Sequence, residues 1–175
     1  MGQVSVYYVP ENQDQWSGCG EELAERLWEY GVFLKTPVIL NRIRAFRDAD
    51  RPFPDCDLDI KAKFGGMGIV DESKEHPVPN YLYEIKCPKC SSDVMDNVNE
   101  VCKEDSKTAL QDRAITCPFC TSKLCIKDLN YVESMEFARF YVYVSDCDQE
   151  VWDPKFRQLL EGIVGPCHEY WEWST

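Results

Sequence analysis

The sequence has only two histidines in 175 residues, and it has no apolar run of the length, about 18 residues, that a membrane-spanning helix needs. Its first ten residues have neither the basic flank nor the apolar segment of a secretory signal. The glycine-rich stretch 65–68 lacks the lysine and hydroxyl residue of a phosphate-binding loop, so we expect a turn there. No serine lies in a nucleophile-elbow pattern. These absences leave little for histidine or serine catalysis, and we expect a cytoplasmic protein without a membrane partner.

Basic residues are also few, because 19 lysines and arginines face 31 acidic residues and the net charge is −12. Such a charge opposes non-specific binding to nucleic acid and favours a basic protein partner. The chain is 44% hydrophobic and 13% aromatic, which is enough for a core of ordinary size. We therefore expect residues 1–175 to form a single domain that does not bind nucleic acid.

Hydrophobic periodicity predicts an α+β fold with a mostly antiparallel sheet and two or three helices. The clearest segments are two strands and two helices, at 4–9, 137–145, 21–30 and 154–164 respectively. The other predicted segments are a strand or short helix at 38–46, strands at 55–64 and 81–86, a loop at 71–80, a helix plus loop at 93–113, and an aromatic tail at 167–173 that docks on the sheet.

Ten cysteines are many for a reducing compartment, and four of them form two CxxC pairs. The pairs are Cys87-Pro-Lys-Cys90 and Cys117-Pro-Phe-Cys120, and they belong to an internal repeat in which 85–94 matches 115–124 at an offset of thirty residues. A two-residue gap lets both sulfurs of a pair bind one tetrahedral ion from a tight turn. We predict that Cys87, Cys90, Cys117 and Cys120 bind one structural zinc ion.

These two motifs resemble the zinc-ribbon or rubredoxin-like knuckle family. The resemblance implies a pair of β-hairpin knuckles in an embedded module at 81–130, and four thiolates would also suit iron. Ser91 and Thr121 replace the glycine that is common after the second cysteine, and 26 residues separate the pairs. The alternatives are unligated thiols or two small disulfides. Cys102 and Cys125 are close enough in sequence to compete as ligands.

An enzyme is the first alternative function. Pro54-Asp55 followed by Glu84-Ile85-Lys86 resembles the PD-(D/E)xK nucleases. The resemblance implies that Asp55 and Glu84 hold a divalent ion and that Lys86 acts at the scissile phosphate. A charged strand face explains the same residues without catalysis, and a net charge of −12 repels a nucleic acid substrate.

Acidic residues also cluster near the strand predicted at 137–145, where five acids accompany one base between 129 and 152. Opposite charge speeds the encounter with a basic protein, and aromatic side chains supply affinity. By electrostatics and size alone, this favours a non-catalytic immunity-type inhibitor of a basic toxin such as a nuclease. A zinc-ribbon adaptor of a larger complex is the other alternative. The predicted partner-binding residues are Glu133, Glu136, Asp146, Asp148 and Glu150.

Overall fold

The computed structural model describes residues 3–30, 38–39, 42–46, 66–79, 84–104, 106–132, 134–145, 147 and 154–174. The fold is α+β with a mostly antiparallel sheet, as predicted. The chain forms two compact units: one combines Met1–Ser73 with Ala138–Thr175, and the other is Lys74–Phe137. Among the described residues, none of the helices combines the length and apolar character required to cross a bilayer.

The first unit is built on a six-stranded sheet in the order β10-β1-β9-β4-β3-β2. Its elements are β1 (Gln3–Pro10), α1 (Gln13–Trp16), α2 (Gly20–Glu29), β2 (Val38–Ile39), β3 (Arg42–Phe46), β4 (Gly66–Val78), β9 (Glu136–Ser145), α4 (Pro154–Val164) and β10 (Cys167–Ser174). Residues 74–78 of β4 and 136–137 of β9 are counted with the second unit. The segment 38–46, whose period is ambiguous, is therefore extended in its described part. The strand predicted at 55–64 lies outside the described residues.

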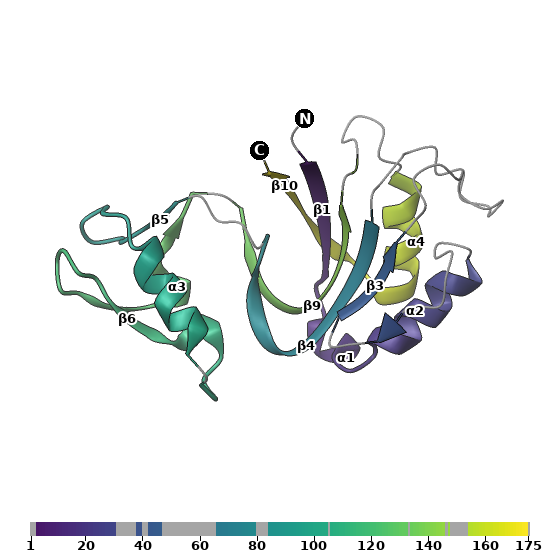
Figure 1. The fold of residues 1–175 in the computed structure, drawn as a ribbon, viewed down its shortest axis with the longest axis horizontal. Coiled ribbons are helices and arrows are strands. Elements are labelled where there is room, and N and C mark those ends of the chain that lie inside the picture. The colour runs from purple at the N-terminus through teal and green to yellow at the C-terminus, as the bar shows by residue number, and fades with distance from the viewer. Residues whose placement is uncertain are drawn as a thin grey trace. The chain divides into compact units, whose positions relative to one another are not determined.

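The order of four of these strands has a simple topological meaning. Strand β1 pairs antiparallel with both β9 and β10, and β4 lies on the other side of β9. Helix α2 follows β1, α4 follows β9, and both lie on the same side of the sheet (Figure 1). This is the strand order of the split βαβ, or ferredoxin-like, arrangement, to which β3 and β2 add an extension beyond β4.

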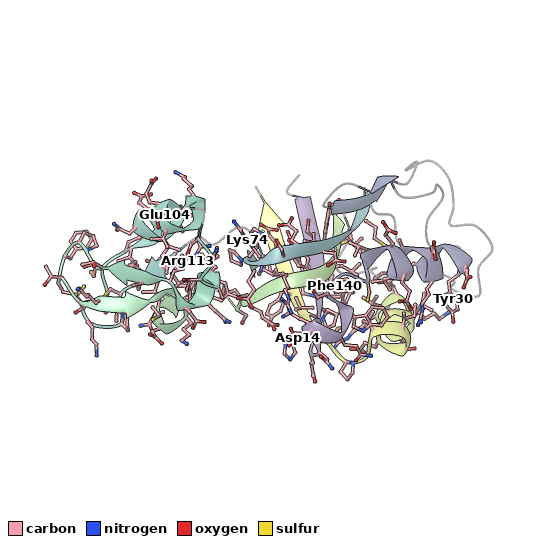
Figure 2. The ribbon with its side chains drawn as sticks, turned by 90° about the horizontal axis from the view of Figure 1, so that it is seen from below. Asp14, Tyr30, Lys74, Glu104, Arg113 and Phe140 are labelled. Carbon is pink, nitrogen blue, oxygen red and sulfur yellow. The ribbon has the colours of Figure 1, made fainter. Side chains whose placement is uncertain are left out.

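The core of the first unit lies between the sheet and its helices. In β9 the alternate residues Phe140, Val142 and Val144 are fully buried in it, which confirms the strand and the face predicted from the sequence. Figure 2 labels Phe140 among these strands. Tyr8 of β1 packs against Phe156 of α4 with the two rings tilted and their centroids 5.6 Å apart. Apolar burial against three helices is thus the main stabilising contribution in this unit.

A carboxylate from the sheet supports the start of α2. Asp71 of β4 accepts hydrogen bonds from the backbone N–H of Gly18 at 2.9 Å and of Gly20 at 2.8 Å. The first N–H groups of a helix have no partner within the helix, and the helix dipole favours negative charge at that end. Asp71 therefore caps α2 from a distant part of the chain.

The C-terminal tail is part of the sheet itself. Strand β10 pairs with β1 along its whole length, from Gln3 opposite Ser174 to Pro10 opposite Cys167. The prediction that an aromatic tail docks on the sheet is confirmed. The backbone pairing goes further, because it makes β10 a strand of the sheet and leaves β1 with neighbours on both sides.

Two predictions for the segment before the cysteine pairs are wrong. The expected turn at 65–68 and the expected loop at 71–80 both fall on β4, which is extended from Gly66 to Val78. Glycine is needed within this strand because a Cβ on Gly68 would lie 2.5 Å from the Tyr143 ring. Pairing with β3 and β9 outweighs the low strand propensity of glycine and proline.

The second unit consists of short elements. They are β5 (Ile85–Lys86), α3 (Met95–Lys103), the 3-10 helix η1 (Leu110–Asp112), β6 (Ala114–Thr116), β7 (Lys123–Cys125), the 3-10 helix η2 (Ile126–Asp128) and β8 (Asn130–Tyr131). The predicted helix plus loop at 93–113 is confirmed by α3 and η1. Of the strand predicted at 81–86, the described part is β5, which pairs with β8.

Candidate metal centre

Four sulfur atoms of the second unit converge on one point. The Sγ atoms of Cys87, Cys90, Cys117 and Cys120 all lie within 4.8 Å of one another. Across the two pairs, Cys87 Sγ is 3.7 Å from Cys120 Sγ and Cys90 Sγ is 3.6 Å from Cys117 Sγ. Such a cluster of thiols has the ligand number and spacing to hold a metal ion. The four cysteines that the sequence paired are therefore brought together.

The same turn presents each pair of sulfurs. In the first turn, Ser91 N donates to Cys87 O at 2.8 Å and Cys87 N donates to Ser92 O at 2.9 Å. In the second turn, the equivalent bonds join the residues thirty positions later, at 3.0 Å each. The second turn connects β6 and β7, which pair antiparallel. The sequence repeat is thus a repeat of backbone structure.

The replacement of glycine after each second cysteine has a backbone cost. Ser91 has φ 59° and Thr121 has φ 58°, so both adopt the left-handed conformation that glycine adopts without strain. A β-branched residue is especially rare there. The turns keep this conformation because their hydrogen bonds and the converging sulfurs over-determine it, at a cost of the order of 1 kcal/mol or more per residue.

The two cysteines of each pair have different surroundings. Cys87 and Cys117 are fully buried and belong to the small core of this unit, together with Ile85 and Ile115. By contrast, Cys90 is exposed and Cys120 is half-buried. Each turn therefore has an inner sulfur that packs against apolar side chains and an outer sulfur that solvent reaches.

Hydrogen-bonding groups lie beside two of these sulfurs. The backbone N–H of Lys89 donates to Cys87 Sγ at 3.4 Å, and the Cys120 thiol donates to the Ser122 hydroxyl oxygen at 3.3 Å. The hydroxyl and N–H of Ser122 lower the pKa of the Cys120 thiol to about 6, and those of Ser92 lower the pKa of Cys90. A lowered pKa favours the thiolate, which is the form that binds metals.

No role for these serines was predicted from the sequence, although the internal repeat contains a signal for them. Ser92 and Ser122 occupy the same position of the internal repeat, two residues after the outer cysteine of each pair. The repeat therefore conserves the hydroxyl together with both ligands of the turn.

Arg113 supports the chain between the two turns and was also missed. Only 8% of its surface is exposed, and its guanidinium donates to three carbonyl oxygens: Val101 O at 2.9 Å, Glu104 O at 3.0 Å and Thr108 O at 3.0 Å. Val101 belongs to the last turn of α3 and Glu104 directly follows that helix. Figure 2 labels Glu104 and Arg113. A buried cation thus gives charged donors to carbonyls in the last turn of α3 and in the segment that follows it.

The other predicted site residues do not join this cluster. Cys102, exposed on α3, and Cys125, half-buried at the end of β7, are outside the group of converging sulfurs. Glu84 and Lys86 form an ion pair with each other, with Nζ 2.9 Å from Oε1. The third predicted nuclease residue, Asp55, lies outside the described residues.

The predicted partner-binding acids are mostly outside the described residues as well. Glu136, at the start of β9, is described and half-buried. The other four, whose placement is not described, are Glu133, Asp146, Asp148 and Glu150. Comparisons with protein-family models, curated proteins and solved structures find no match to this chain.

Proposed function

We propose that the four-cysteine cluster binds one zinc ion and that this ion has a structural role. The observation that carries the proposal is the convergence of four sulfurs within 4.8 Å from two turns of the knuckle type. Zinc prefers tetrahedral thiolate coordination. Four protein ligands leave no open position for a substrate, so the ion would hold the fold together without catalysing a reaction.

We further propose that the whole chain is a non-catalytic protein that binds a basic protein partner in the cytoplasm. The excess of acidic over basic residues lies mainly in the first unit. Residues 74–137 contain 11 acidic and 8 basic residues, whereas the remainder contains 20 acidic and 11 basic residues. The solvent face of α2 supports this proposal, because Arg26 is its single base and is paired with Glu22 at 2.6 Å. Its exposed acids are Glu21, Glu22, Glu25 and Glu29.

The most concrete form of this proposal is an immunity-type inhibitor that covers the cationic active site of a toxin such as a nuclease. The test is co-purification with basic candidate toxins from a panel of nucleases. We expect a complex whose association rate falls with salt, and falls strongly when Asp146, Asp148 and Glu150 are replaced by lysine. A complex indifferent to these charge reversals would contradict the electrostatic proposal.

The alternatives use other features of the same chain. A PD-(D/E)xK-type nuclease would need Asp55 to approach Glu84 and Lys86. Magnesium-dependent cleavage by the wild type, lost in Glu84→Ala, would support the nuclease and oppose the inhibitor. An adaptor of a larger complex would keep the structural zinc and bind a partner that is not a toxin.

A further inference from the structure

A serine lies two residues after each outer cysteine of the candidate metal centre. The Ser122 hydroxyl lies 3.3 Å from Cys120 Sγ, and Ser92 occupies the equivalent position in the first turn. We propose that Ser92 and Ser122 are positioning residues that hold the outer thiolates on the metal and slow its release. This inference rests on the proposed metal binding. It assigns part of the control of metal release to two residues that are not ligands.

The accessibility of the four sulfurs indicates which of them the hydroxyls affect. The inner sulfurs, Cys87 and Cys117, are buried among apolar side chains, so water and competing ligands have no direct access to them. The outer sulfurs are the accessible ones, with Cys90 exposed and Cys120 half-buried. Loss of the metal should therefore begin at an outer sulfur, and the Ser122 hydroxyl lies beside one of the two.

A hydroxyl at this position has two effects on a thiolate ligand. It can donate a hydrogen bond to a lone pair of a metal-bound thiolate, which offsets the crowding of negative charge around the ion. It also fixes the orientation of the sulfur, as partners of metal ligands generally do, and losing such a partner costs about 10–100-fold in metal affinity. Both effects keep the outer sulfur on the metal.

The turn itself does not require these hydroxyls. Its backbone is closed by the N–H of the inner cysteine, which donates to the carbonyl oxygen of Ser92 in the first turn and Ser122 in the second. Alanine preserves both carbonyls. The recurrence of the hydroxyl in two turns of different sequence, Pro-Lys and Pro-Phe, points to a role at the sulfur rather than in the turn.

The experiment uses the full-length chain loaded with zinc, and separately with Co²⁺, whose sulfur charge-transfer absorption reports the ligand set. Transfer of the metal to a chromogenic chelator is followed for the wild type, Ser92→Ala, Ser122→Ala and the double variant. We expect each single variant to release metal about tenfold faster and the double variant more than either. Ser122→Thr, which keeps the hydroxyl, should restore slow release.

Ser106→Ala is the matched control, because it also removes a serine hydroxyl from the second unit. That hydroxyl accepts from Thr108 N at 3.1 Å in a separate turn, and its loss should leave the release rate unchanged. Release from both alanine variants at the wild-type rate would overturn the role of the serines while leaving the metal site intact. Failure of the wild type to take up metal would overturn the metal site and this inference together.

Discussion

The two compact units are stabilised in different ways. In the first, long strands and three helices surround a core that includes the fully buried Tyr8, Phe140 and Phe156. In the second, the strands β5 to β8 are two or three residues long, and the buried core consists of aliphatic residues and two of the clustered cysteines. Short strands with a small core rarely fold without a further constraint. The comparison shows that apolar burial stabilises the first unit, and it supports the proposal that a metal ion stabilises the second.

The largest effect should come from removing the metal. Stripping it with a chelator, or replacing buried Cys117 with serine, should unfold the second unit, because structural zinc contributes about 10 kcal/mol or more to small modules. Hydrogen exchange read by mass spectrometry should then rise across 84–132 and stay low in β1 and α4. Cys102→Ser, outside the cluster, should retain the metal and the protection. Unchanged hydrogen exchange after complete metal loss would contradict the proposal that the metal stabilises the second unit.

A large effect confined to the first unit should follow from Phe156→Ala. Phe156 is fully buried against Tyr8, and truncation of such a residue costs about 3–5 kcal/mol through lost burial and the cavity left behind. Urea unfolding followed by tryptophan fluorescence, to which buried Trp16 contributes, should show the loss, with metal content unchanged. Phe119→Ala is the control, since 67% of that side chain is exposed and its truncation should change stability by less than about 0.5 kcal/mol.

A smaller effect in the second unit should follow from Arg113→Ala. The change leaves three carbonyl oxygens, two of them at the end of α3, without their charged donor, which should cost about 2–3 kcal/mol. The measurement is the exchange protection of α3 in the metal-loaded protein. The control is Lys103→Ala on the same helix, whose ion pair with Glu100 is solvent-exposed and should contribute little. Equal effects of the two substitutions would show that Arg113 does not support α3.

The smallest expected effect is a gain. Thr121→Gly removes a β-branched residue from a φ of 58°, and should stabilise the metal-loaded second unit by about 1 kcal/mol. Ser91→Gly should give a smaller gain in stability, because serine is not β-branched. Thermal unfolding of the metal-loaded protein measures both. A loss of stability in both variants would mean that the left-handed turns carry no strain.

The elements that could be predicted from the sequence are those whose hydrophobic pattern lies within one segment. The alternation in β9 and the helical period of α2 and α4 were read from the sequence because each reflects one buried face. The failure at β4 has the opposite cause. Its glycines and prolines predict a turn and a loop, and the partners that make it a strand come from β3 and β9, far away in the chain.

The sequence alone determined which four cysteines form the cluster and the α+β class, because two-residue cysteine spacing and hydrophobic periodicity are properties of short segments. Only the tertiary structure decided the strand order, the pairing of β10 with β1, the cap that Asp71 places on α2, and the hydroxyl beside Cys120. Each of these depends on which groups meet in space, and a hydrogen bond exists only where a donor and an acceptor lie within about 3 Å in the right orientation.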